Sequence, residues 1–310
     1  MPPTPASAVY TALLGGYERL NDDQELGDGS VPFICFTDDP SLTSSVWDVR
    51  LVTPLFARDL QRSQRDLKIR GHRDLELFER TLYIDNSVSL LAPPTQILDD
   101  WLADADVAAP AHSFRENVFD EFLAVLDAAL DDPMRVNEQL HLYSDIAPYV
   151  LAERPSWNGM IARRHSPHVA AMMSRWFDEV SRYSRRDQLS SNFVFGLHPV
   201  AVRHVEISNL GSTIHRWPVE VGRLAQPALG RARPTLPDLA RERLLEAELH
   251  GGQRRFDSER ELDNARHAAM LASTSWRVTA PLRVLGSFLA RIKRSNSPQS
   301  GVGTNQTGAE

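Results

Sequence analysis

The sequence predicts an α/β fold: a mixed sheet with a partly parallel core, flanked by helices and followed by a C-terminal helical extension. Short β-favouring runs alternate with polar helical stretches in the first half of the chain, which is typical of this class. The 310 residues are 42% apolar and 24% charged, which suits one large domain with an appendage. From Pro218 onward the composition shifts to proline, arginine and leucine.

Four strands are predicted in the N-terminal part, each a short apolar run that ends at a glycine, an aspartate or another breaker. They cover residues 8–14, 32–37, 47–52 and 80–84. Residues 58–77 are polar with few breakers apart from Gly71. We therefore expect a helix there, with Arg65, Lys68 and His72 on one face.

After residue 94 the pattern is mainly helical. Helices are expected over residues 96–102, 115–130, 136–144 and 169–184, and strand-like segments follow at 193–195 and 200–207. These patterns predict a domain over residues 8–217 and a linker over 218–240. A helical extension over 241–294 and a disordered tail over 295–310 complete the predicted organisation.

Composition excludes several classes of protein. No apolar run approaches the roughly 18 to 20 residues of a membrane-spanning helix, and the N-terminus lacks the pattern of a secretory signal, so we expect a cytoplasmic protein. Cys35 is the one cysteine of the chain, so an internal disulfide and a thiolate zinc site are excluded. A metal ion would therefore be bound by oxygen or imidazole.

The charge is unevenly distributed. Residues 1–222 carry 20 lysines and arginines against 32 acidic residues, whereas residues 223–310 carry 14 against 9. An acidic front half makes a nucleic-acid partner unexpected, because phosphates require a basic face. Residues 281–294 combine an apolar stripe with basic residues and could lie on the inner face of a membrane as a peripheral contact. Packing of this helix on its own domain or on a partner is the alternative.

Two acidic sites follow predicted strands. Asp85 comes at the carboxyl end of the strand over residues 80–84, where open α/β sheets place their ligands, and a hard divalent ion prefers such oxygen ligands. Asp38 and Asp39 follow the second strand and could accept hydrogen bonds from a base or a ribose. For both sites the alternative is a simple turn.

Cationic and polar side chains gather in two further places. Arg65 and Lys68 could bind a diphosphate, or could form a solvated helix face. Residues 184–190 pack two arginines, an aspartate and an amide into one turn after an apolar helix, which suggests the edge of a pocket. Asp187 could orient or deprotonate an acceptor hydroxyl there, and a buried ion pair with Arg185 or Arg186 is the alternative.

Five blocks of the sequence, taken in order, resemble a family of glycosyltransferase-like domains found in bacteria and in plant Golgi proteins, which are similar to GT-A nucleotide-sugar transferases. The blocks are residues 9–17, residues 33–40, Arg65 to His72, residues 82–86 and residues 186–190. The likeness spans roughly residues 8–216. It implies a GT-A-like, Rossmann-type mixed sheet, a nucleotide-sugar donor and a glycan or glycolipid acceptor.

The resemblance also implies roles for individual residues. On the donor side they are Tyr10, Thr11, Ala12, Asp38, Asp39, Arg65, Lys68 and His72. On the acceptor side they are Arg186, Asp187 and Gln188, and the catalytic candidates are Lys68 and Asp187. Mn²⁺ or Mg²⁺ would be bound by Asp85, Ser87 and His215. The family has Ile-Asp-Gly-Asn where this chain has Ile84-Asp85-Asn86-Ser87, and a serine is a poorer metal ligand than a carboxylate.

The function implied by the resemblance is transfer of a sugar from a nucleoside diphosphate to an acceptor in cell-surface glycan biosynthesis. Residues 273–283 resemble a short segment that recurs in bacterial glycan-assembly proteins and indicate the same setting. A non-catalytic module or scaffold of the same fold, binding a glycan or a nucleotide, is the alternative that the departure at Ser87 favours.

Overall fold

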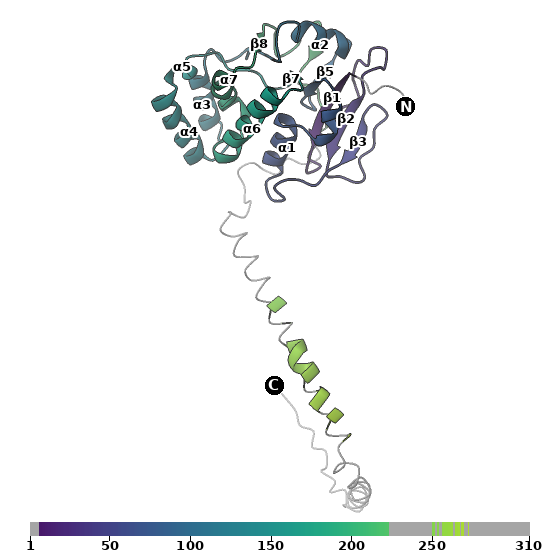
Figure 1. Cartoon of the computed structure of the whole chain (residues 1–310). Helices are drawn as coiled ribbons and strands as arrows, with labels where there is room; N and C mark the ends of the chain where they lie inside the picture. Colours follow the sequence, from purple (N-terminus) through teal and green to yellow (C-terminus); the bar gives the residue numbers. More distant parts are fainter. Residues whose placement is uncertain are drawn as a thin grey trace, which may run out of the picture. The chain divides into compact units, whose positions relative to one another are not determined.

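The protein is described here by a computed structural model (Figure 1). It describes residues 6–222 and, in a second unit, residues 250–272 except 252, 254–255, 263, 267 and 270–271. The described residues of the second unit are helical. Most of the predicted linker, the basic helix over residues 281–294 and the tail over residues 295–310 lie outside the described residues, so those predictions stay open.

A seven-stranded mixed sheet forms the centre of the first unit, in the order β3-β2-β1-β4-β7-β6-β8. Its first four strands in that order are parallel, β7 runs antiparallel to both β4 and β6, and β6 is parallel to β8. The strands are β1 (Ser7–Leu13), β2 (Phe33–Thr37), β3 (Asp48–Leu51), β4 (Arg80–Ile84), β6 (Val107–Pro110), β7 (Met160–Arg164) and β8 (Val202–Val205). A small antiparallel pair joins β5 (Ser89–Leu90) to β9 (His215–Arg216).

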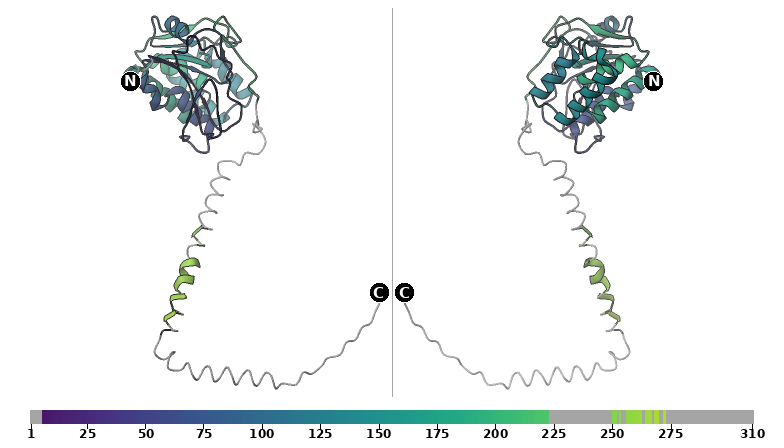
Figure 2. Two further views of the ribbon diagram at one scale, coloured as in Figure 1. Left: turned by 90° about the vertical axis from the view of Figure 1, so that its right-hand side faces the viewer. Right: turned by 90° about the vertical axis from the view of Figure 1, so that its left-hand side faces the viewer.

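Helices cover both faces of the sheet (Figure 2). They are α1 (Leu60–Ile69), α2 (Pro94–Trp101), α3 (Val118–Asp127), α4 (Pro133–Ile146), α5 (Pro148–Leu151), α6 (Pro167–Arg182) and α7 (Ser191–Leu197), with 3₁₀ turns η1 (Arg73–Leu77) and η2 (Asp187–Leu189). Polar side chains begin the longer ones: Asp59 caps α1, Asn117 caps α3 and Ser166 caps α6.

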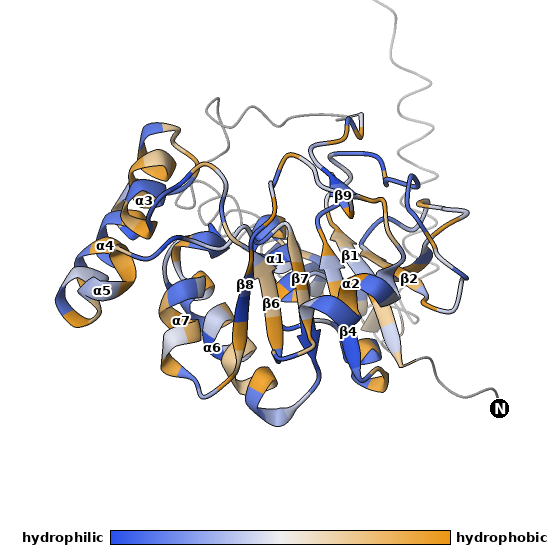
Figure 3. Cartoon of the chain, turned by 90° about the horizontal axis from the view of Figure 1, so that it is seen from above, coloured by the Kyte–Doolittle hydropathy of each residue, from blue (hydrophilic) through white to orange (hydrophobic). Residues whose placement is uncertain are grey.

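The sheet separates two apolar cores, because successive side chains of a strand point to opposite faces. Along β1, Tyr10 packs into the core shared with α1 and α6, whereas Val9 packs into the core shared with α2. The strands β4, β7, β6 and β8 lie side by side in Figure 3, with apolar stretches along β6 and β7. Burial on both faces explains the nearly continuous apolar run of β1.

The predicted fold class, a mixed sheet flanked by helices, is confirmed, and so are the first four predicted strands. The helix expected over residues 58–77 ends at Ile69, because Gly71 has a φ of +81°, a backbone conformation that favours glycine. Residues 193–195 were predicted to be strand-like, and this prediction is wrong. They belong to α7, whose Phe195 packs against Trp176 of α6 and whose Phe193 stacks on Tyr143 of α4.

Among the residues described, no helix is both long enough and apolar enough to cross a bilayer.

Candidate functional site

The candidate site lies where β4 ends and α1 faces the carboxyl edge of the sheet. Asp85 is the first residue after β4, and its backbone N–H donates to the carbonyl of Gly159, which leads into β7, at 2.8 Å. The Asp85 side chain is 34% exposed. A carboxylate is thus fixed at the edge of the sheet with part of its surface open to a ligand.

Helix α1 is held at its C-terminal end by the sheet. The Tyr10 hydroxyl donates to the Lys68 carbonyl at 2.7 Å, and the Arg163 guanidinium donates to the Ile69 carbonyl. These carbonyls belong to the last turn, where a cation also complements the helix dipole. Side chains of a helix lean toward its N-terminus, so those of Arg65 and Lys68 lie back along α1, toward the edge that carries Asp85.

Four charged side chains meet there, and we call Arg65, Lys68, Asp85 and Asp187 the ion cluster. Lys68 Nζ lies 2.8 Å from Asp187 Oδ2 and 3.4 Å from Asp85 Oδ1. Arg65 Nε lies 3.7 Å from Asp187 Oδ1. The side chains of Lys68 and Asp187 are only 2% and 4% exposed. Residues far apart in sequence therefore form one bridged group of two cations and two carboxylates.

Aromatic and amide groups fix the position of Asp85. The Tyr83 hydroxyl donates to Asp85 Oδ1 at 2.7 Å, and Gln64 Nε2 donates to that hydroxyl at 2.8 Å. Lys68 Nζ also lies 5.1 Å from the centre of the Tyr83 ring. Burial and the neighbouring Asp85 hold the pKa of Tyr83 well above its usual range, so this hydroxyl stays a donor.

The buried carboxylates of Asp187 and Glu121 have different electrostatic environments. Burial alone would raise the pKa of Asp187, but Lys68 and Arg65 beside it bring this pKa below its ordinary value. Glu121, buried in the first turn of α3, accepts a hydrogen bond from Arg115 Nε at 3.0 Å. Burial raises the pKa of Glu121 in spite of its arginine neighbours. Asp187 therefore suits an ionised, orienting role, and Glu121 is the better proton acceptor.

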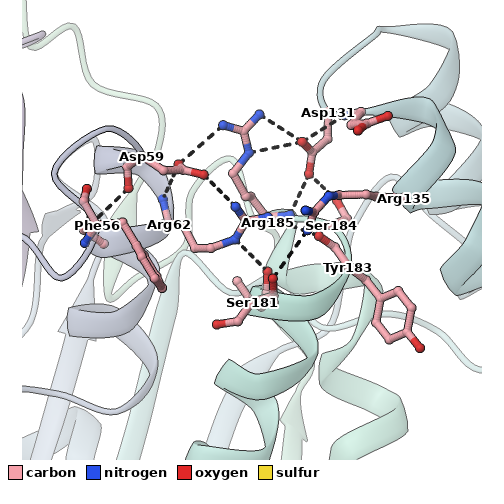
Figure 4. Close-up of polar contacts among 12 residues, drawn as sticks. Phe56, Asp59, Arg62, Asp131, Arg135, Ser181, Tyr183, Ser184 and Arg185 are labelled. Atoms are coloured by element: carbon pink, nitrogen blue, oxygen red, sulfur yellow. Dashed lines mark hydrogen bonds and ion pairs between the residues drawn. The ribbon is translucent and has the colours of Figure 1, made fainter. Parts of the chain in front are cut away.

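A second network of ion pairs fixes the turn that precedes Asp187 (Figure 4). Asp131, whose side chain is 2% exposed, accepts hydrogen bonds from the Ser184 hydroxyl at 2.8 Å and from the Arg185 backbone N–H at 2.6 Å. The Arg185 guanidinium lies 2.9 Å from Asp131 and 3.4 Å from Asp59, the capping residue of α1. Arg62, on α1, pairs with Asp59 and donates to the carbonyls of Val180 and Tyr183. The network thus joins α1, α6 and the turn before Asp187.

Several buried polar atoms near this site have no hydrogen-bond partner in the described part of the chain. They include Arg65 Nε, Arg186 Nε and both side-chain atoms of Asn158, one residue before Gly159. Arg186 also donates to Gln188 Oε1 at 3.2 Å through another nitrogen. Buried donors and acceptors are normally satisfied, so these atoms indicate a polar ligand or water at this place.

The remaining predicted donor residues differ from one another in their surroundings. Tyr10 and Thr11 are fully buried, and Ala12 is 2% exposed. Asp38 Oδ1 accepts from the Gly15 N–H at 2.8 Å, and Asp39 accepts from Ser41, as turn-forming aspartates do. His72 Nδ1 lies 3.3 Å from Asp74 Oδ1, and the His72 ring packs against Phe36. Contact of these residues with a donor stays a prediction.

The predicted metal ligands other than Asp85 are engaged within the protein. Both ring nitrogens of the buried His215 have partners, Ser212 Oγ at 2.9 Å and the Asn209 carbonyl at 3.1 Å. Ser87 Oγ accepts from Trp217 Nε1 at 3.1 Å. No three His, Cys, Asp or Glu side chains gather into a metal-binding group among the residues that the structure describes. The donor set therefore does not fit a preformed divalent metal site.

Tyr17 is a candidate that the sequence did not single out. Its side chain is partly exposed, and Arg65 and Asp85 lie near enough to affect the pKa of its hydroxyl, which burial holds above its usual range. It follows Gly15 and Gly16, both with positive φ, in the loop that leaves β1. A glycine pair after a strand and before an aromatic residue is the signal that could have indicated it.

Parts of this chain are similar in sequence to known proteins. The family model TOD1/MUCI70, glycosyltransferase-like domain, matches residues 6–207. A relative from Arabidopsis thaliana, named probable hexosyltransferase MUCI70, is 30% identical over 158 residues, which are 48% of this chain. The match covers 27% of that relative, so the two proteins share only about a quarter of its length.

Two solved structures of low sequence identity also align with the chain. Core-mannan synthase A (CmsA/Ktr4) from Aspergillus fumigatus, in its Mn/GDP form, aligns with a TM-score of 0.42 and 10% identity, over 76% of this chain and 82% of that one. The apo structure of the bifunctional glycosyltransferase WbbM aligns with a TM-score of 0.42 and 12% identity, over 66% and 39% of the two chains.

Proposed function

This chain belongs to the family of TOD1/MUCI70 glycosyltransferase-like domains, and we propose that it transfers a hexose or a related sugar from a nucleoside diphosphate to a glycan or glycolipid acceptor. The named relative is a probable hexosyltransferase, which supports the reaction class. We also propose cell-surface glycan biosynthesis as its setting, and a cytoplasmic location with peripheral membrane contact through residues 281–294. The sequence pattern supports that location.

The ion cluster is the observation that carries this proposal. Transfer of a sugar leaves negative charge on the departing diphosphate, and cations that are already in place stabilise it without reorganisation. Lys68 is buried and Arg65 is largely buried, and both cations are held by Asp187 beside the more exposed Asp85. In this proposal the donor diphosphate binds next to Asp85, where Lys68 and Arg65 meet its oxygens.

The acceptor occupies the side of the site formed by η2 and α3. Gln188 and Arg186 offer hydrogen-bond donors there, and Asp187 orients the acceptor hydroxyl. Glu121, with its raised pKa, accepts the proton of that hydroxyl. None of these steps requires a divalent ion, and the predicted Mn²⁺ or Mg²⁺ is the subject of a separate test below.

Nucleotide release from a panel of UDP- and GDP-hexoses tests the proposal. Thermal shift identifies the donors first, because a ligand that prefers the native state raises the melting temperature. The wild-type protein should release nucleoside diphosphate from at least one of them, and Lys68→Met should abolish this release. Arg70→Met is the matched control, since it removes a cation from the end of the same helix, where Arg70 pairs with Asp66.

The same assays separate the enzyme from its alternative. A non-catalytic module of this fold would bind a nucleotide or a glycan, but would release no nucleoside diphosphate above the rate of the control without protein. If none of the donors shifted the melting temperature and none were cleaved, the proposed reaction would be refuted.

A further inference from the structure

The side chains of the residues that follow β4 are already engaged in hydrogen bonds to the loops around the site. Asn86 Nδ2 donates to the Arg19 carbonyl at 2.8 Å, and Asn86 Oδ1 accepts from the Asn21 N–H at 2.9 Å. Ser87 is engaged by Trp217, and His215 by its two partners. A metal ion that took the place of these partners would have to break buried or part-buried hydrogen bonds, at a cost for each group left unpaired.

A cation of the protein already lies between the two carboxylates. The Lys68 ammonium is 2.8 Å from one oxygen of Asp187 and 3.4 Å from one oxygen of Asp85. An ammonium group carries three protons, so two can serve these carboxylates and the third can serve another acceptor. A divalent ion bound to Asp85 Oδ1 would stand next to this ammonium, and like charges at such a distance repel.

We propose that the Lys68 ammonium takes the place of a divalent cation at this site, so that the donor diphosphate binds without a metal ion. This inference rests on the proposed function, because it concerns the same donor. Arg65 supplies the second positive charge, and its Nε lacks a hydrogen-bond partner within the described residues. The two cations balance the charges of Asp85 and Asp187, and phosphate oxygens supply further acceptors when a donor binds.

Calorimetric titration with UDP and GDP, in EDTA and in Mn²⁺, provides the first test. For the wild-type protein we expect the same affinity in both conditions. Lys68→Met should weaken binding in EDTA by roughly tenfold to a hundredfold, the loss expected for one hydrogen bond to a charged group. Lys68→Arg keeps the charge and should bind in EDTA more tightly than Lys68→Met, and Arg70→Met should bind like the wild type.

Electron paramagnetic resonance of Mn²⁺ alone gives a second readout that needs no nucleotide. Removal of the ammonium leaves Asp85 and Asp187 facing each other without the cation between them. We therefore expect Lys68→Met to bind Mn²⁺, and the wild-type protein and the double variant Lys68→Met/Asp85→Asn to leave it free.

The outcomes separate this inference from the proposed function. If Mn²⁺ tightened wild-type UDP or GDP binding tenfold or more, and Asp85→Asn removed the gain, the inference would be overturned and the proposed function would stand. If neither nucleotide bound in either condition, both would fall. If Lys68→Met did not fold, as judged by its thermal unfolding, the comparison of the wild type with Asp85→Asn would still decide.

Discussion

Asp131→Ala is expected to destabilise the protein strongly, although Asp131 lies outside the ion cluster. The variant removes the acceptor of hydrogen bonds from Ser184 and from the Arg185 backbone and guanidinium. Breaking a buried pair costs about 3–5 kcal/mol, because the remaining charge stays buried. The Arg185 side chain is 22% exposed and keeps Asp59 at 3.4 Å, so we expect the lower end, about 3 kcal/mol.

Urea unfolding and thermal unfolding measure this loss. For a domain of this size, about 3 kcal/mol corresponds to a fall of roughly 6 to 12 °C in melting temperature. Glu138→Ala is the control, because it also removes a carboxylate that pairs with an arginine, but both side chains of that pair are about half exposed. It should leave the melting temperature nearly unchanged. If Asp131→Ala and Glu138→Ala behaved alike, the network in Figure 4 would not fix the turn before Asp187.

Three further predictions concern Tyr17, Gly15 and the histidines His112 and His165. Tyr17→Ala should weaken UDP or GDP binding roughly two- to tenfold in calorimetry, since an aromatic side chain beside the proposed diphosphate site is lost. An unchanged affinity would remove Tyr17 from the site. Gly15→Ala should lower the free energy of unfolding by about 1–3 kcal/mol, because φ is +83° there and a Cβ would lie 2.9 Å from Leu60 Cδ1; equal urea midpoints would contradict this. Burial lowers the pKa of His112 and of His165 from 6.5 to about 4. The unfolded state therefore binds more protons between these values, and stability should fall as pH drops from 6.5 to 4, by up to about 3 kcal/mol per histidine. A flat pH profile of the free energy of unfolding over that window would refute the reasoning.

Part of this structure could be predicted from local pattern. Strand β4 contains Thr81, Tyr83 and Ile84, which favour β-structure, so its position and the place of Asp85 directly after it followed from sequence. The strands β6 and β7 were missed, because alanine, proline and arginine give them little β-propensity. Their pairing with β4 and β8 supplies the stability that their residue types lack. Buried aromatic contacts likewise override the β-propensity of α7.

The sequence predicted which residues form the candidate site, but not which of them contact one another. Arg65, Lys68, Asp85 and Asp187 all stood out in the sequence, and the structure brings them together. Spacing could show that the two cations share a helix face, but not that Asp187, more than a hundred residues away, lies between them. The role of Asp131 could not be predicted either, because its partner is far away in sequence. It lies in an acidic stretch between two helices, and its partner Arg185 is 54 residues further along the chain.

Contacts at the two ends of α1 explain how the residues of the ion cluster, which are far apart in sequence, are held next to one another. At its C-terminal end, Tyr10 and Arg163 bind the last carbonyls and tie the helix to the sheet that carries Asp85. At its N-terminal end, Asp59 contacts Arg185 and ties the helix to the turn that carries Asp187. Lys68 contacts the carboxylates of Asp85 and Asp187, so its ammonium can bridge them only while the contacts at both ends of α1 are present. Loss of the contacts at either end of α1 should therefore weaken the ion pairs of the same cluster, even though neither set of contacts includes Lys68 Nζ.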